Sequence, residues 1–197
     1  MNVMDEYVDI KGSKIHYVTN VRENGGDAVL LLHGKRFTTR DWVESGLMET
    51  LERQGVQAIA LEMPGYGESE ELDLDPEDFL AEFMKRMNLS AVHIVGPSFS
   101  GEISIRFALK FPDMLKSMII IDSINVDKYE DKLKDIKVKT LIVWGKKDNI
   151  APYEFAEILK DHLPESTLFT FEDLGHTCYF DDMPTFSDVL IKFINEN

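Results

Sequence analysis

Residues 91–101 read AVHIVGPSFSG, an apolar run that leads through a turn of small residues into a more polar segment. This pattern predicts a strand, a sharp turn and a helix, with Ser98 exposed at the turn. The backbones of strand and helix nearly touch there, so the residues two before and two after the serine must be small. Gly96 and Ser100 meet this requirement for Ser98, whereas a turn centred on Ser100 would need a small residue where Glu102 stands. Ser98 is therefore the predicted nucleophile.

Outward from this segment, short apolar runs alternate with amphipathic segments. An N-terminal hairpin is predicted at 7–10 and 14–18, further strands at 28–32, 56–61, 91–95, 117–121, 140–144 and 167–171, and helices at about 39–54, 76–87, 102–110, 152–162 and 184–194. Such alternation is typical of an α/β fold with a mostly parallel sheet and helices on both faces. The length of 197 residues predicts one domain, residues 1–197.

The composition excludes several classes of protein. With 21 basic and 36 acidic residues, the formal net charge is −15, which repels phosphate backbones, so nucleic acid is not an expected partner. The single cysteine cannot form an intramolecular disulfide or a cysteine-based zinc site. Residues 1–6 do not read as a signal peptide, and no apolar run approaches the ~18 residues of a membrane span. We expect a cytoplasmic protein that does not bind membranes.

Two further loops supply the groups that a serine nucleophile needs. By itself, the pattern around Ser98 also fits an ordinary strand–turn–helix joint with a capping serine. A hydroxyl becomes a useful nucleophile only beside a base that is itself oriented by an acid. Asp148 and His176 each stand in a loop just after a predicted strand, at the sheet edge where open α/β sheets place their sites. These three residues form the predicted catalytic set, and Asp122, after the strand at 117–121, remains an alternative acid.

Acyl transfer also needs donors for the negative oxygen that develops on the substrate. One predicted donor is the backbone N–H of Phe99, which follows the nucleophile at the start of a helix. The other is the backbone N–H of Lys35, in the loop after the strand at 28–32, where Gly34 lets the chain turn. His33 is interpreted as a residue that fixes this loop by hydrogen bonding.

With these loops in place, the sequence resembles the α/β-hydrolase superfamily over nearly its full length. Residues 62–69, EMPGYGES, are similar to the D-x-P-G-x-G-x-S loop of that superfamily, with Glu62 in place of Asp. Three stretches resemble the small lidless CIB-like hydrolases: 33–37 (HGKRF), 97–101 (PSFSG) and 175–179 (GHTCY). The resemblance implies an eight-stranded sheet, a Ser-His-Asp triad and esterase activity on small activated acyl esters. It also implies two candidate properties of some relatives, binding to protein partners and deacylation of lysine side chains with transfer to coenzyme A.

The spacing of the motifs agrees with a lidless fold. Relatives with a lid insert a helical cap in the place that residues 122–139 occupy here, and this segment is long enough for a short helix at most. A thin cover excludes little water and cannot bury a long acyl chain. We therefore predict no substantial cap domain and a shallow, open site.

Candidate substrate-contacting residues lie in the same loops: Arg36, Phe37, Tyr66, Cys178 and Tyr179. Lys35, Arg36 and Arg40 form a basic cluster, either a solvated loop or an anchor for a carboxylate or phosphate, which guanidinium binds bidentately. Cys178 is either a packed thiol or a redox-sensitive one, and packing is favoured. For the aromatic residues, core packing is an equally good interpretation.

Together these features predict a serine hydrolase, similar to a carboxylesterase, that cleaves small acyl esters or thioesters through an acyl-enzyme. Ser98 attacks, His176 takes its proton and Asp148 orients the imidazole. No cofactor and no metal ion is expected. The alternatives are a protein-lysine deacylase or acyl transferase to coenzyme A, and a partner-binding module that retains the fold.

Overall fold

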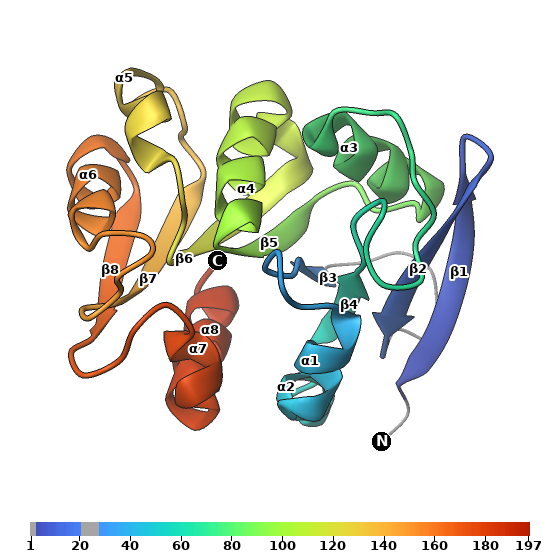
Figure 1. Ribbon diagram of the computed structural model, residues 1–197, viewed down its shortest axis with the longest axis horizontal. Helices are drawn as coiled ribbons and strands as arrows, with labels where there is room; N and C mark the ends of the chain where they lie inside the picture. Colours follow the sequence, from blue (N-terminus) through green and yellow to red (C-terminus); the bar gives the residue numbers. More distant parts are fainter. Residues whose placement is uncertain (1–2, 21–27) are drawn as a thin grey trace.

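The computed structural model describes residues 3–20 and 28–197, and its centre is an eight-stranded sheet (Figure 1). The strands are β1 (Met4–Ile10), β2 (Ser13–Thr19), β3 (Ala28–Leu31), β4 (Gln57–Leu61), β5 (Val92–Pro97), β6 (Leu115–Ile121), β7 (Lys139–Gly145) and β8 (Ser166–Phe171). Their order across the sheet is β1-β2-β4-β3-β5-β6-β7-β8. Strands β1 and β2 form an antiparallel hairpin, β2 pairs antiparallel with β4, and all other pairs are parallel. The predicted α/β fold is confirmed.

Helices cover both faces of this sheet (Figure 1). One face carries α3 (Pro76–Arg86), α4 (Phe99–Lys110) and α6 (Glu154–His162), and the other carries α1 (Thr39–Glu44), α2 (Leu47–Arg53), α7 (Cys178–Asp181) and α8 (Met183–Asn195). Because successive strand residues point to opposite faces, Ile94 and Ile120 enter the first core while Val95 and Ile119 enter the second. Burial on both faces explains why the central strands read as continuous apolar runs.

The prediction of a single helix at 39–54 was wrong, because the structure forms two helices there. Helix α1 ends at Glu44 and α2 begins at Leu47. Between them, Gly46 has φ of 80° and ψ of 2°, a left-handed conformation that interrupts the helical hydrogen bonds. Helix α4 also begins earlier than predicted, at Phe99, directly after Ser98.

The chain between β6 and β7 contains no large insertion. It holds a 3₁₀ turn, η2 (Val126–Tyr129), and the short helix α5 (Glu130–Leu133), and a second 3₁₀ turn, η1 (Pro112–Met114), precedes β6. Val126 and Leu133 are fully buried in the core beside α6, so this segment packs onto the domain. The expected absence of a cap domain is confirmed. In the described part of the chain, no helix combines the length and the apolar character needed to cross a membrane.

Candidate active site

Ser98 stands at the sharp turn between β5 and α4. Its backbone has φ of 54° and ψ of −119°, in a region that residues with a side chain rarely adopt. Two backbone hydrogen bonds fix this turn. The Ser98 N–H donates to the Ile121 carbonyl of β6 at 2.8 Å, and the Gly101 N–H donates to the Ser98 carbonyl at 3.0 Å. Such strain persists only where the surrounding structure fixes it, and here it presents the hydroxyl above the sheet edge.

The small neighbours of Ser98 are explained by what surrounds them. A Cβ on Gly96 would overlap the Ser104 hydroxyl and the Ser100 carbonyl, which are themselves joined by a hydrogen bond of 2.7 Å. Ser100, where the usual motif has glycine, is fully buried and its hydroxyl donates to the His33 carbonyl at 2.6 Å. This departure from the motif therefore links the nucleophile turn to the loop that follows β3, a role that the sequence pattern did not reveal.

Gly96→Ala is expected to destabilise the fold by about 2 kcal/mol or more, because overpacking against fixed backbone forces the strand and α4 apart. Denaturant unfolding followed by circular dichroism measures this change. Gly175→Ala is the matched control, because a Cβ there would meet the Lys147 carbonyl group at ordinary distances of 3.6 Å to its oxygen and 4.0 Å to its carbon. The control should stay within about 0.5 kcal/mol of the parent protein, and an equal loss in both variants would contradict the explanation.

The structure brings Ser98, His176 and Asp148 into one hydrogen-bonded series. His176 Nε2 lies 2.9 Å from Ser98 Oγ, and His176 Nδ1 lies 2.7 Å from Asp148 Oδ2. The other oxygen of Asp148 accepts from the N–H groups of Ile150 at 2.7 Å and Ala151 at 2.9 Å, so the carboxylate is fixed in the turn after β7. The Asp148 side chain is 0% exposed and that of His176 16% exposed, so the series is buried at the acid and open at the base.

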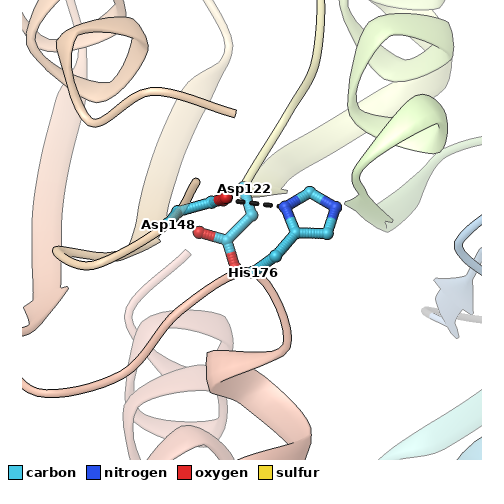
Figure 2. Close-up of side chains that lie close together, drawn as sticks. All are labelled: Asp122, Asp148 and His176. Atoms are coloured by element: carbon cyan, nitrogen blue, oxygen red, sulfur yellow. Dashed lines mark hydrogen bonds and ion pairs between the residues drawn. The ribbon is translucent and has the colours of Figure 1, made fainter. Parts of the chain in front are cut away.

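Asp122, the alternative acid, lies beside the imidazole but does not bind it (Figure 2). Its Oδ1 accepts from the Gly145 N–H at 2.9 Å and its Oδ2 accepts from the Cys178 thiol at 3.1 Å. Because His176 Nδ1 donates to Asp148, the geometry pairs the base with Asp148.

The electrostatics of the two acids differ. Burial alone would lower the pKa of His176, but the hydrogen bond to Asp148 and the charge of Asp148 outweigh burial and raise it above its ordinary value of 6.5. Burial raises the pKa of Asp122 to about 8, against the lowering effect of its hydrogen bonds to Gly145 and Cys178. With this pKa, Asp122 is mainly uncharged near pH 7.

The group of Asp122, Asp148 and His176 also has the spacing of metal ligands. One possible ligand atom from each side chain lies within 4.8 Å of the other two. In the described part of the chain, these three residues form the group that could hold a metal ion. These side chains already bind one another or neighbouring donors through the hydrogen bonds given above. The triad interpretation accounts for the contact between His176 and Asp148, whereas the two contacts of Asp122 lie outside it. The expectation of a metal-free site stays a prediction.

The two predicted oxyanion donors are the backbone N–H groups of Lys35 and Phe99. Within the described residues, neither Lys35 nor Phe99 donates its backbone N–H to another protein group. Phe99 is the first residue of α4, where such N–H groups have no partner inside the helix. The role of both amides as oxyanion donors stays a prediction.

His33 fixes the loop after β3, as predicted. Its Nδ1 lies 3.0 Å from the Gly34 carbonyl, and its Nε2 accepts from the Met63 N–H at 3.1 Å. Burial lowers the pKa of His33, which agrees with a neutral ring that has one donor and one acceptor nitrogen. His33 is 1% exposed, so it supports the loop from inside the fold.

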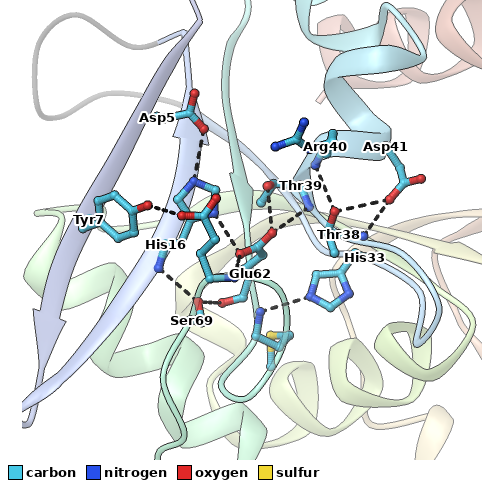
Figure 3. A network of polar contacts seen from close by, with 12 residues as sticks. Asp5, Tyr7, His16, His33, Thr38, Thr39, Arg40, Asp41, Glu62 and Ser69 are labelled. Atoms are coloured by element: carbon cyan, nitrogen blue, oxygen red, sulfur yellow. Dashed lines mark hydrogen bonds and ion pairs between the residues drawn. The ribbon is translucent and has the colours of Figure 1, made fainter.

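Glu62 anchors the far end of the same loop (Figure 3). Its carboxylate accepts from the Thr39 hydroxyl at 3.0 Å, lies 2.8 Å from His16 Nδ1 and accepts from the Glu68 N–H at 2.7 Å. Burial alone would raise the pKa of Glu62, but these three hydrogen bonds lower it below its ordinary value. The longer side chain in place of Asp therefore still joins the 62–69 loop to the start of α1.

The candidate substrate-contacting residues fall into two groups. Arg36 is exposed, Phe37 is half-buried against Phe180 at 5.1 Å between ring centres, and Tyr66 stacks on Phe99 at 5.6 Å. These side chains lie in or against the loops that carry the site. In contrast, Cys178 is 0% and Tyr179 2% exposed, so both support the His176 loop from within the core and offer no open surface to a substrate.

The comparisons with known proteins show the family to which this fold belongs. The profile of a family described as α/β hydrolase fold matches residues 27–131, which is more than half of the 197 residues. The chain belongs to the α/β-hydrolase fold family. A second profile, described as TAP-like protein, matches residues 121–196.

Relatives and solved structures in this family extend over most of the chain. Human ABHD14B is 31% identical, covering 85% of this chain and 82% of its own length. ABHD14B from Rattus norvegicus is 28% identical, covering 96% and 94%. The structure of a CIB-like hydrolase from Thermoplasma acidophilum has a TM-score of 0.94 at 24% identity and covers 100% of both chains, and an esterase from Exiguobacterium antarcticum has 0.84 at 19%, covering 98% and 100%. At these identities the structural likeness establishes the fold, and the predicted resemblance to CIB-like hydrolases is confirmed.

Proposed function

We propose that this member of the hydrolase family is a serine hydrolase that cleaves small acyl esters or thioesters through an acyl-enzyme. The observation that carries the proposal is the hydrogen-bonded series from Ser98 Oγ through His176 to Asp148, with distances of 2.9 and 2.7 Å. This arrangement of hydroxyl, imidazole and carboxylate serves to activate a nucleophile.

The residues have defined roles in the proposed reaction. With its Nδ1–H donated to Asp148, His176 has a free electron pair on Nε2 and takes the proton of Ser98 as the hydroxyl attacks the acyl carbon. The backbone N–H groups of Phe99 and Lys35 stabilise the oxygen that becomes negative. His176 then gives its proton to the leaving group, and the Ser98 ester forms. Water or another acceptor, deprotonated by His176, attacks this ester and releases the acyl group.

A second candidate activity, removal of acyl groups from protein lysine side chains, is supported by the relatives. The human and rat ABHD14B proteins are named as candidate protein-lysine deacylases. The proposed acyl-enzyme would serve this activity as well, with coenzyme A or water as the acceptor. Incubation with an acetyl-lysine peptide, with and without coenzyme A, separates this activity from ester hydrolysis. A partner-binding module without activity would form neither acetate nor acetyl-coenzyme A in any of these assays.

Acyl-chain length tests the proposed open site. Because the segment between β6 and β7 packs onto the domain through Val126 and Leu133, it provides no cover that could bury a long chain. Acetyl and butyryl esters of 4-nitrophenol should have kcat/KM values within about ten-fold of each other and above that of the octanoyl ester. An octanoyl ester cleaved much faster than the acetyl ester would contradict the proposal of a shallow site.

The pH dependence tests the proposed base. His176 takes a proton only when it is neutral, so kcat/KM is expected to rise with pH through the pKa of His176 and then to level off. Since Asp148 raises this pKa above 6.5, the midpoint should lie above 6.5. Rates for an acetyl ester between about pH 5 and 9 give the profile. A midpoint below 6.5, or no change over this range, would argue against His176 as the base.

A further inference from the structure

Asp122 connects the two loops that carry the acid and the base. It is 1% exposed and stands at the end of β6, between the strand that carries the acid turn and α7, which follows the base. One carboxyl oxygen accepts from the N–H of Gly145, the first residue of the turn that ends at Asp148. The other oxygen contacts the thiol of Cys178, two residues after His176.

We infer that Asp122 is a positioning residue, whose buried carboxyl group holds the Asp148 turn and the His176 loop in the register that their hydrogen bond requires. This inference rests on the proposed function, since the register matters only if the imidazole acts on Ser98. No substrate contact is assigned to Asp122.

The backbone around Asp122 shows that its placement is specified. Asp122 has φ of 43°, in the left-handed region that Asp tolerates better than most residues, and its own N–H donates to the Val143 carbonyl at 3.1 Å. The neighbouring Ser123 is also fully buried, and a Cβ on Gly101 of α4 would overlap it. Turning the chain here directs the Asp122 side chain back toward Gly145 and Cys178, along the sheet edge that carries the site.

The charge of Asp122 suits this role. The titratable groups around it are Asp148 from the turn after β7, His176 from the loop after β8, and Cys178 and Tyr179 from α7. Because burial raises its pKa to about 8, Asp122 is mainly neutral near pH 7 and does not compete with Asp148 for the Nδ1–H of His176. A neutral carboxyl still accepts from the Gly145 N–H and donates its proton toward the sulfur, while the ionised form accepts from the thiol, so the link exists in both states.

The test compares Asp122→Ala with Asp122→Asn. Alanine removes both links, whereas asparagine keeps an oxygen for the Gly145 N–H and an amide donor for the sulfur. With an acetyl ester near pH 7, we expect Asp122→Ala to lower kcat by roughly 30- to 100-fold while KM changes less than about two-fold, because misplaced catalytic groups slow the chemical step. Asp122→Asn should restore kcat to within about three-fold of the parent protein, as the geometry is kept.

Ser117→Ala is the matched control, because Ser117 lies on the same strand and also makes a buried hydrogen bond, with His93 at 2.8 Å.

A second readout does not depend on activity. The downfield proton NMR signal of the His176 Nδ1–H reports its hydrogen bond to Asp148, and His176→Gln identifies the signal. We expect it to be lost or shifted in Asp122→Ala and kept in Asp122→Asn and Ser117→Ala. If the parent protein shows no hydrolysis that depends on Ser98, the proposed function fails, and this signal still tests the link between the loops.

Two results would overturn the inference: an unchanged kcat and an unchanged Nδ1–H signal in Asp122→Ala, or a loss in Asp122→Asn as large as that in Asp122→Ala. Should Asp122→Ala not fold, Cys178→Ala takes its place, since it removes one link and leaves the backbone N–H groups paired. It should lower kcat by about three- to ten-fold with unchanged KM, and wild-type kinetics with an unchanged signal would overturn the inference.

Discussion

Ser98→Ala is expected to abolish hydrolysis of an acetyl ester, with kcat lowered by roughly 10⁴- to 10⁶-fold. Without the hydroxyl no acyl-enzyme forms, and the remaining oxyanion donors give only a small rate above the uncatalysed reaction. Steady-state rates at saturating substrate measure the effect. The variant should fold normally, because the Ser98 side chain contacts only His176 through a hydrogen bond in the described structure.

Ser104→Ala is the matched control for this variant. It removes the buried hydrogen bond of 2.7 Å to the Ser100 carbonyl in the same helix, without touching the nucleophile. The control should lose stability by about 1 kcal/mol and keep a kcat within a few-fold of the parent protein. If Ser98→Ala kept a rate similar to that of Ser104→Ala, Ser98 would not be the nucleophile.

Asp148→Asn is expected to lower kcat by roughly 10⁴-fold. An asparagine amide can replace the oxygen that Ile150 and Ala151 bind, but its NH₂ group would then face His176 Nδ1. That contact favours the imidazole tautomer with its proton on Nε2, which cannot accept the proton of Ser98. Steady-state kinetics with the same ester measure the loss.

Asp122→Asn is the comparison that distinguishes the two acids. Because Asp122 does not contact the imidazole and is mainly neutral near pH 7, its replacement by the neutral isostere should leave kcat within about three-fold. The opposite pattern, with Asp148→Asn nearly active and Asp122→Asn inactive, would transfer the role of the acid to Asp122.

Sequence patterns predicted much of the fold and the nucleophile turn because these depend on local rules. Apolar runs buried on both faces predicted the central strands, and the need for small residues around the turn predicted Ser98 at the sharp turn before α4. The break at Gly46 was missed because the apolar residues of α1 and α2 continue with helical spacing across it. A glycine within such a pattern does not reveal its φ.

The contacts that support the site could not be predicted in the same way. The Ser100 hydroxyl bond to the His33 carbonyl and the contact of Asp122 with Cys178 join residues 67 and 56 positions apart. Whether such groups meet depends on strand register, which the sequence does not show. The sequence likewise predicted Asp148 as the acid but kept Asp122 as an alternative, and the hydrogen bond of His176 Nδ1 distinguishes them only in three dimensions.

Covalent trapping tests the central claim most directly. The protein is incubated with a fluorophosphonate, which reacts with activated serine hydroxyls, and intact mass and peptide mapping locate the adduct. We predict one adduct per chain, on Ser98, formed much more slowly in His176→Gln and absent in Ser98→Ala. An adduct on another residue, or equal labelling of Ser98→Ala, would contradict the account.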